Sequence, residues 1–357
     1  MLSIIIPTLN ERKNIDLNVK LLSKLLNSIK YEIIFVDDNS TDGTFNYCQF
    51  LGEADPLIRS ILREDRRGLS SAVVEGILSS RYPIICVVDA DLQYDMSGIL
   101  TAFNFIKSNK YDLVIMTRTM LKDKSKTNLS KFRLLMTRLS SKLSGYFISG
   151  VKDPNSGFFL VRKKLILDEL NNLSKIGFKI LLDFLMSCKN SNKQIKIYEL
   201  DTSFNDRLYG ESKLNLTIFV DLVEMFIDKL FRKIIPGSFV LFLFSGLAGF
   251  LMQIYALTFL INIVPSKNEV IFFTSSLAML LNFYLNNEIT FRKNKLKRIN
   301  FYYGALKFFI VCSAGFLINL NIQEHLNSFS LYTFALSTLV ASFWNYSVSK
   351  NFVWRIK

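Results

Sequence analysis

The fold of the N-terminal half is indicated by one stretch, Pro83-Ile-Ile-Cys-Val-Val-Asp-Ala-Asp-Leu-Gln93. An uninterrupted apolar run that ends in turn residues is typical of a strand buried on both faces. Two carboxylates, Asp89 and Asp91, follow that run one residue apart, so both can turn toward one hard cation. The stretch therefore predicts a strand of a parallel sheet with a ligand site beyond its carboxyl end.

Three further apolar runs have the same character, and they cover residues 3–7, 32–36 and 112–116. Helical patterns separate the strands, at residues 15–28, 68–80 and 96–107. This alternation predicts a βαβ architecture, that is, an α/β domain of Rossmann-like topology over residues 1–213. Polar residues also follow the first two runs, Asn10-Glu11 after one and Asp37-Asp38 after the other. We therefore expect several polar loops to meet at one edge of the sheet.

The C-terminal third has a different composition. The whole chain is 50% hydrophobic, with a mean hydropathy of +0.26 and a net charge of +14, but its apolar residues concentrate after residue 236. An all-α membrane domain is expected over residues 236–357. Its four predicted transmembrane helices cover about 237–262, 270–291, 302–323 and 328–350.

The loops of this region predict its orientation. Basic residues gather before the first span, between the second and third spans, and at the C-terminus, while the other two loops hold only Lys267. Because basic loops stay in the cytoplasm, we expect both termini and the N-terminal domain to be cytoplasmic. Residues 237–357 carry +7 of the net charge of +14, which the loop topology explains, so nucleic-acid binding is not needed to explain it.

The membrane region contains an internal repeat. Residues 282–292 (NFYLNNEITFR) align with residues 345–355 (NYSVSKNFVWR), and residues 248–251 align with 314–317. The unit is therefore a hairpin of two helices that is used twice.

Residues 214–235 form the connection between the two halves, and their pattern is that of amphipathic juxtamembrane helices. Two arrangements remain open for this segment. The helix lies in the plane of the membrane interface, or it packs on the soluble domain.

Scarce residue types exclude some kinds of catalysis. The chain has one histidine, His325, which excludes sites that need several imidazoles. The four cysteines lie far apart without metal-ligand spacing, so reduced, buried thiols are expected.

Several motifs, taken in order, carry a resemblance to a known family. They are Gly68-Leu-Ser-Ser-Ala72, Asp89-Ala-Asp-Leu-Gln93, Asp153-Pro-Asn-Ser-Gly-Phe-Phe159, Gly177-Phe-Lys179 and Arg207-Leu-Tyr-Gly-Glu-Ser-Lys213. Over residues 2–215 the chain resembles family 2 glycosyltransferases of the GT-A fold, and among them the polyprenyl-phosphate sugar synthases of the dolichol-phosphate mannose synthase type. The region of four spans resembles the GtrA-like membrane domain.

The resemblance implies roles for individual residues. Positions that line the nucleotide sugar correspond to Pro7, Leu9, Glu11, Val36, Asp38, Asp89, Ala90, Asp91, Arg118, Lys179, Arg207 and Lys213. The positions that bind a divalent cation, Mg²⁺ or Mn²⁺, correspond to Asp91, Gln93 and Asp89. The catalytic set comprises Asp89, Asp91, Arg118, Arg133, Arg207 and Lys213, with Arg133 in a segment that helps to hold the lipid phosphate. Leu9 stands where the family often has an aromatic residue, so base stacking gives no indication of guanine or uracil.

The function that the resemblance implies is inverting transfer of a hexose from a nucleotide sugar to a dolichyl or undecaprenyl phosphate. GDP-mannose is the favoured donor, and UDP-glucose is the alternative. Transfer to a protein or a soluble sugar, and a non-enzymatic transporter of lipid-linked sugars, are rival functions. The expected location is the cell membrane of a prokaryote. The expected partners are the nucleotide sugar, the lipid acceptor and the membrane. Nucleic acid is not an expected partner, and assembly into a homo-oligomer stays open.

Overall fold

The computed structural model describes residues 1–64, 68–119, 144–145, 148, 150–205, 216–232, 234–260, 263, 266–325 and 331–355. The chain forms two compact units, Met1–Lys229 and Leu230–Lys357.

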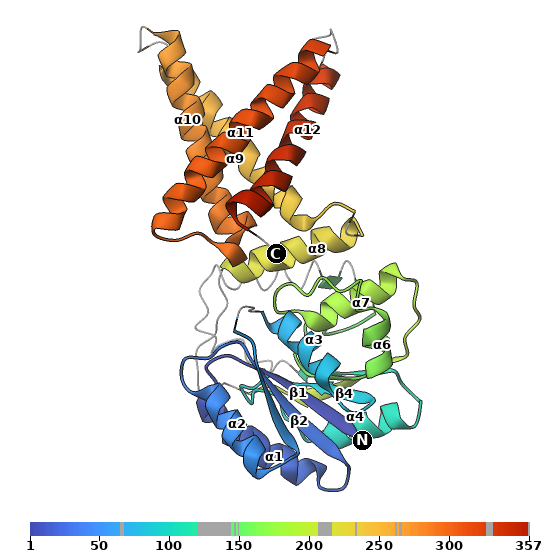
Figure 1. Cartoon of the computed structure of the whole chain (residues 1–357). Helices are drawn as coiled ribbons and strands as arrows, with labels where there is room; N and C mark the ends of the chain where they lie inside the picture. The colour runs from blue at the N-terminus through green and yellow to red at the C-terminus, as the bar shows by residue number, and fades with distance from the viewer. Residues whose placement is uncertain are drawn as a thin grey trace. The chain divides into compact units, whose positions relative to one another are not determined.

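The first unit is built on a mixed sheet, in which the described residues form seven strands (Figure 1). The strands are β1 (Leu2–Thr8), β2 (Tyr31–Asp37), β3 (Ile58–Leu62), β4 (Ile84–Val87), β5 (Leu113–Thr119), β6 (Phe159–Arg162) and β7 (Ile197–Ser203). Their order is β3-β2-β1-β4-β6-β5-β7, and β6 runs antiparallel to both of its neighbours. The four predicted strands are present as β1, β2, β4 and β5, and they share one direction. The edge strands β3 and β7 are partly exposed, so they lack the apolar runs that reveal the others.

Helices cover both faces of this sheet. Alternate strand residues point to opposite sides, so Ile4 and Ile6 belong to one core and Ile5 to the other. The first face carries α1 (Ile15–Leu26), α2 (Thr44–Ala54) and α4 (Ile99–Lys107), with the short η1 (Arg12–Asn14) before α1. The second face carries α3 (Leu69–Ser79), α6 (Lys163–Asp168) and α7 (Ile180–Asn190). This two-sided cover leaves the carboxyl ends of the strands for the site.

The connecting segment contains one long helix, α8 (Leu216–Leu230). Its residues Leu222, Met225 and Phe226 join the core of the first unit. Lys229 is also buried, and its ammonium group lies 2.5 Å from Asp183 Oδ1 of α7. The contacts therefore show α8 packed on the α/β unit, which is one of the two arrangements that the sequence left open.

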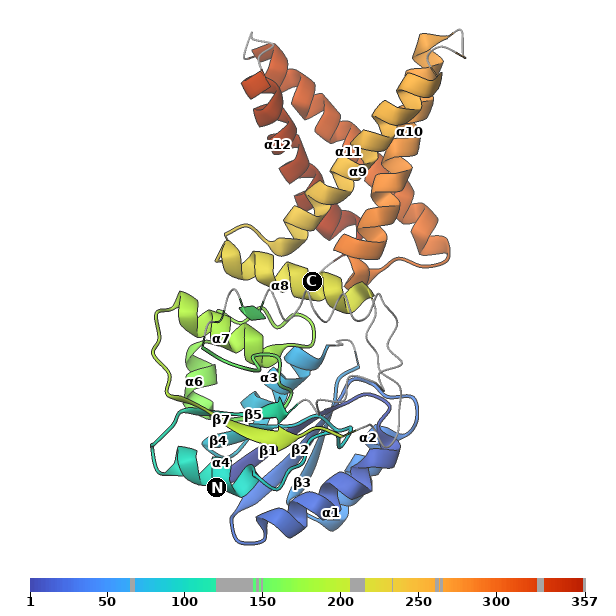
Figure 2. The same ribbon diagram turned by 180° about the vertical axis from the view of Figure 1, so that it is seen from behind.

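The second unit consists of helices arranged as two hairpins. Its helices are α9 (Gly237–Leu260), α10 (Lys267–Leu285), η3 (Asn286–Thr290), η4 (Arg292–Asn294), α11 (Ile299–His325), α12 (Leu331–Val348) and η5 (Ser349–Val353). Helix α9 pairs with α10, and α11 pairs with α12 (Figure 2). The single histidine is the last residue of α11.

Three helical segments of this unit are long and apolar enough to cross a membrane, judged by length and composition within the described residues. They are Gly237–Leu260, Asn268–Thr290 and Ile299–Asn319. The fourth predicted span is helical as α12, but polar residues at 345 and 347 near its end reduce its hydrophobicity, and it does not join this set. Three of the four predicted spans are therefore long and apolar enough to cross a membrane.

The sequence repeat has a structural counterpart. Segments η3 and η5 are π-helices, and they occupy equivalent positions at the ends of α10 and α12. The rings of Phe291 and Trp354, one from each repeat, stack with their centroids 4.2 Å apart.

Candidate active site

The carboxyl ends of β1, β2 and β4 meet at one edge of the sheet. Parallel pairing sets Thr8 opposite Asp37 and Ile5 opposite Val87. The backbone continues this alignment, because Asp38 N–H donates to Thr8 O at 3.0 Å. The polar loops that follow the three strands are therefore neighbours, as the sequence predicts.

The loop after β4 is a tight turn with a defined shape. Leu92 has a φ of 58°, which is the left-handed region that non-glycine residues seldom adopt. The N–H of Gln93 points at Asp91 Oδ1 over 3.3 Å, and its side-chain amide donates to Asn205 O at 3.0 Å. In return, Asn205 N–H donates to Gln93 O at 2.8 Å. This bracing places Asp91 and Gln93 on one turn, two residues beyond Asp89.

Asp89 packs directly against a glycine of another loop. A Cβ atom added at Gly157 would lie 2.1 Å from Asp89 Oδ2. The position of Gly157 is fixed by its N–H, which donates to the buried Tyr94 hydroxyl at 3.0 Å. The same hydroxyl lies 3.2 Å from Ser156 Oγ. The loop of residues 153–157 thus forms one wall around the Asp89 carboxylate, and only glycine fits there.

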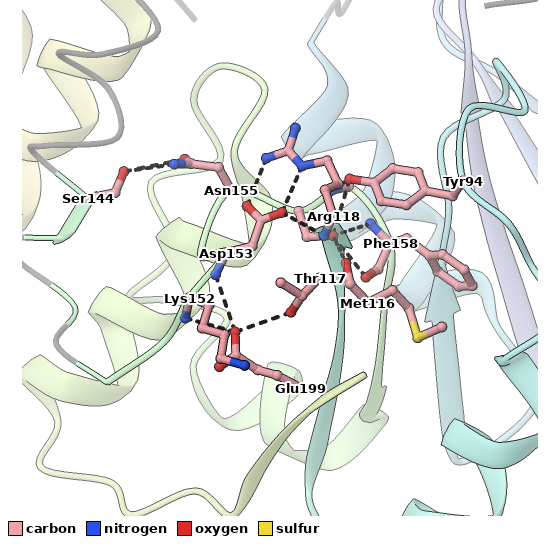
Figure 3. Close-up of polar contacts among 12 residues, drawn as sticks. Tyr94, Met116, Thr117, Arg118, Ser144, Lys152, Asp153, Asn155, Phe158 and Glu199 are labelled. Carbon is pink, nitrogen blue, oxygen red and sulfur yellow. Dashed lines mark hydrogen bonds and ion pairs between the residues drawn. The ribbon is translucent and has the colours of Figure 1, made fainter. Parts of the chain in front are cut away.

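Arg118, at the end of β5, is held by a bidentate ion pair (Figure 3). Its Nε and Nη2 donate to the two oxygens of Asp153 at 2.7 and 2.8 Å. Glu199 of β7 in turn accepts from the N–H groups of Lys152 and Asp153, at 2.8 and 3.2 Å, and from Thr117 Oγ1 at 3.3 Å. Burial is the largest single influence and lowers the pKa of Arg118, but the hydrogen bonds to Asp153 and the charges of Tyr94, Asp153 and Asp89 together raise it, so the guanidinium group stays charged.

Lys179 lies in the same electrostatic environment. Its ammonium group is 3.5 Å from Asn155 O, in the loop that also carries Asp153. Burial, followed by repulsion from Arg118, lowers the pKa of Lys179 to about 8, although Asp89 and Asp153 oppose this shift. The acidic turn and two cations therefore interact at one edge of the sheet.

The loop after β2 is braced by a buried arginine. Arg63, which follows β3, forms an ion pair with Asp38 Oδ1 and another with Glu75 Oε2 at 3.1 Å. The N–H of Gly68 donates to the second Asp38 oxygen at 2.7 Å. Burial raises the pKa of Asp38, although Gly68 and Arg63 favour its charged form. Asp38 thus links β2 to the start of α3.

The remaining predicted nucleotide-site residues differ in burial. Glu11 follows β1; its N–H donates to Thr44 Oγ1 at 3.0 Å, and its carboxylate accepts from Asn14 at 2.7 Å. Leu9 is partly exposed and Pro7 is buried. The side chains of Val36 and Ala90 are buried in the two cores, so these positions can present only backbone atoms to a ligand.

Three of the predicted site residues, Arg133, Arg207 and Lys213, lie outside the described residues. The structure adds others that the sequence reasoning did not assign to the site, namely Arg63, Tyr94, Asp153, Gly157 and Glu199. Asp153 and Gly157 belong to a motif that carries the family resemblance, so the motif was the available signal for them. Arg63 and Glu199 act through long-range contacts that sequence spacing does not encode.

Comparisons with known proteins agree for both units. Residues 3–169 match the family described as Glycosyl transferase family 2, and residues 241–354 match the GtrA/DPMS transmembrane domain. A dolichol-phosphate mannosyltransferase of Pyrococcus furiosus is 32% identical over 329 residues, which cover 89% of this chain and 88% of that protein. The protein of the same name from Saccharomyces cerevisiae is 28% identical, over 72% of this chain and 98% of its own length.

A solved structure shares the fold of the first unit. It is the glucosyl-3-phosphoglycerate synthase of Mycobacterium tuberculosis in complex with Mn²⁺, uridine diphosphate and phosphoglyceric acid. The TM-score is 0.50 at 15% identity, over 64% of this chain and 78% of that one. The α/β unit thus has the GT-A-like fold. With the sequence match that extends through both units, the chain belongs to the dolichol-phosphate mannosyltransferase family of family 2 glycosyltransferases, with a GtrA/DPMS-type transmembrane domain as its C-terminal unit.

Proposed function

We propose that this glycosyltransferase moves mannose from GDP-mannose to a polyprenyl phosphate, with inversion at the anomeric carbon. The observation that carries the proposal is the acidic turn of Asp89 and Asp91, in which the charge of Asp89 interacts with Arg118 and Lys179 at one edge of the sheet. An edge of this kind suits a substrate with a diphosphate, because a metal ion and cationic side chains can offset the negative charge of that group. The names of the relatives support mannose as the sugar and a polyprenyl phosphate as the acceptor.

A divalent cation is part of this proposal, held by Asp89, Asp91 and Gln93. The donor set of two carboxylates and one amide oxygen fits Mg²⁺ or Mn²⁺, which prefer oxygen ligands. Among the described residues no three acidic, histidine or cysteine side chains form a metal cluster. A site with so few protein ligands suits a cation that is shared with substrate phosphates. When bound, the cation offsets the charge that develops on the leaving nucleoside diphosphate.

The protein itself has mainly to position two anions. A polyprenyl phosphate is already ionised, so it can attack without a general base, and the absence of histidine from the site poses no obstacle. Arg118, fixed by Asp153, and Lys179 reduce the repulsion between donor and acceptor. Arg133, Arg207 and Lys213 are proposed to hold the acceptor phosphate; their roles rest on the resemblance.

The membrane unit is proposed to cross the bilayer four times, with α12 as the fourth span beside α11. Basic residues before α9, in the loop after η3 and at the C-terminus favour a cytoplasmic location for those segments. The first unit then meets its nucleotide sugar on the cytoplasmic side of a prokaryotic cell membrane.

The test is transfer of radiolabelled sugar to polyprenyl phosphate by the full chain in detergent, with GDP-mannose and UDP-glucose compared as donors. We expect labelled lipid from GDP-mannose, its loss in EDTA, and recovery with Mg²⁺ or Mn²⁺. Asp91→Ala should lower kcat at least about 100-fold. The matched control is Asp95→Ala, which removes an exposed carboxylate from the same segment and should leave activity intact.

Product from UDP-glucose alone would assign glucose as the transferred sugar. The absence of labelled lipid with either donor, or full activity of Asp91→Ala, would contradict the proposal. The absence of product would favour the rival function of a lipid-linked sugar transporter.

A further inference from the structure

The second unit contains buried oxygen atoms that no protein group satisfies. Asn286 Oδ1, Thr290 Oγ1, Asn345 Oδ1 and Ser349 Oγ have no hydrogen-bond partner, and they are half of all such side-chain atoms among the described residues. Asn286 and Ser349 are completely buried, and Thr290 is 5% exposed. An unpaired polar atom is costly in an apolar interior, and more so where no bulk water reaches it. These oxygens therefore point to a ligand.

The two repeats share one of these positions. Ser349 is equivalent to Asn286, whereas Asn345 is equivalent to Asn282 and Thr290 is equivalent to Val353. Each π-helical end also closes with the same i to i+5 hydrogen bond, Phe291 N–H to Asn286 O at 2.7 Å and Trp354 N–H to Ser349 O at 3.1 Å. π-Helical turns are rare and frequently mark functional sites. Because both repeats carry a π-helical end whose first residue has an unpaired oxygen, this shared arrangement is a built feature rather than a local packing defect.

The two π-helical ends lie side by side. Phe291 follows η3 and Trp354 follows η5, and their rings stack at 4.2 Å. The indole N–H of Trp354 also donates to Asn287 Oδ1 at 3.0 Å. The unpaired oxygens at 286, 290 and 349 are therefore within about one turn of a shared aromatic contact.

Glycines on the opposing helices allow the asparagines to come close. A Cβ atom added at Gly315 would lie 2.1 Å from Asn345 Oδ1, and one added at Gly249 would lie 3.4 Å from Asn282 Cβ. Gly249 and Gly315 occupy equivalent places in the repeat. Each hairpin thus has a small-residue contact at the asparagine that begins its polar end.

The unpaired atoms indicate which kind of ligand can bind. The Asn286 amide nitrogen donates to both Asn282 O and Asn282 Oδ1, at 2.9 and 2.6 Å, so its oxygen must face away from them as an acceptor. An amide oxygen can only accept, and both amide and hydroxyl oxygens can serve as ligands of a cation. They also sit at the C-terminal ends of α10 and α12, where the helix dipole is negative.

The charge balance favours a monovalent cation. Divalent cations in proteins generally require carboxylates. The carboxylate of the first π-helical end, Glu288, is paired with Lys295 at 2.6 Å. We propose that the paired π-helical ends bind a monovalent metal cation, Na⁺ or K⁺, through the side-chain oxygens of Asn286, Thr290, Asn345 and Ser349. This site is independent of the transfer reaction proposed above.

Trp354 provides a reporter inside the site. In a Trp344→Phe background it is the sole tryptophan. We would titrate the full chain in detergent with NaCl or KCl against N-methyl-D-glucamine chloride, at constant ionic strength. The expected result is a saturable change in Trp354 emission with Na⁺ or K⁺, and none with the organic cation.

Two conservative variants test the ligands. Thr290→Val and Ser349→Ala each remove one hydroxyl oxygen and should raise the half-saturating concentration at least about tenfold. Asn351→Ala, an exposed residue of the same π-helical end, is the matched control and should bind as the parent does. Cation-dependent thermal stabilisation, measured in parallel, should be lost in the same two variants.

An equal response to all three salts would overturn the proposal and leave ordered water as the partner of these oxygens. An unchanged response in both hydroxyl variants would overturn it as well.

Discussion

Polar side chains at the sheet edge of the first unit and at the π-helical ends of the second unit have different surroundings. At the sheet edge, charged groups are braced by protein partners, as Arg118 is by Asp153 and Asp38 is by Arg63 and Gly68. At or beside the π-helical ends, four buried side-chain oxygens have no partner among the described residues. Bracing fixes charges in place before a charged substrate arrives, which reduces the reorganisation that catalysis requires. Unpaired acceptors gain stability only when something binds. Replacing a braced group should therefore lower activity or stability whether or not a ligand is present. Replacing an unpaired group should have an adverse effect only when the ligand is present.

Among the variants that test this comparison, the largest effect is expected from Gly157→Ala. The new methyl group would meet the Asp89 carboxylate, which is the end of a rotatable side chain, so the fold should survive while Asp89 moves aside. A displacement of about 1 Å at a reacting centre can lower the rate about 100-fold, and we expect a loss of kcat of that size in the sugar-transfer assay.

Gly145→Ala is the control for this substitution. Among the described residues, a Cβ atom at Gly145 meets nothing within 4 Å, and this variant should keep full activity. Equal activity of the two alanine variants would show that Asp89 does not need its present position.

A smaller loss is expected from Asp153→Asn. The amide can accept only one of the two bonds from Arg118, and losing a bond to a charged group costs about 2 kcal/mol, or about 30-fold in kcat/KM. Asp112→Asn alters another Asp–Arg contact of the same sheet, with Arg162 at 3.4 Å, and should leave the kinetics unchanged. If Asp153→Asn were as active as the parent, bracing of Arg118 would have no catalytic role.

Lys179 should impose a pH dependence. Its pKa is lowered to about 8, so the ammonium charge is present below that pH and lost above it. If the charge holds a substrate phosphate, kcat/KM should fall about tenfold per pH unit on the alkaline side. Lys179→Arg should move the decline to higher pH, because a guanidinium group stays charged. Lys175→Arg, at an exposed site nearby, should leave the pH of the decline unchanged. If activity declined at the same pH in Lys179→Arg as in the parent, the decline would belong to a group other than Lys179.

The sequence predicts the parts of the site that follow from local patterns. The apolar runs predict β1, β2, β4 and β5, and parallel pairing then brings Asp38 and Asp89 to one edge. The antiparallel β6 breaks the expected parallel order, because a short strand such as Phe159–Arg162 does not encode its direction.

Long-range braces could not be predicted in this way. Arg63 lies 25 residues from Asp38, and Glu199 lies 46 residues from Asp153. Such contacts depend on how the strands are ordered in the sheet, and spacing along the chain does not supply that order. The repeat similarly predicts two hairpins, whereas the π-helical ends depend on a shift of the hydrogen bonds from i+4 to i+5.

The smallest effect tests the contrast itself, by deleting one buried hydroxyl from each region. Tyr94→Phe leaves the Gly157 N–H without its acceptor, which should cost the first unit about 1–2 kcal/mol of stability. Thr290→Val removes an oxygen that has no partner among the described residues, so in buffer without Na⁺ or K⁺ the second unit should lose no stability. Thermal inactivation of transfer reports the first unit, and emission from Trp344 and Trp354 reports the second. A large loss of stability in Thr290→Val without added cation would mean that the Thr290 hydroxyl already has a hydrogen-bond partner. The contrast between the two regions would then not hold.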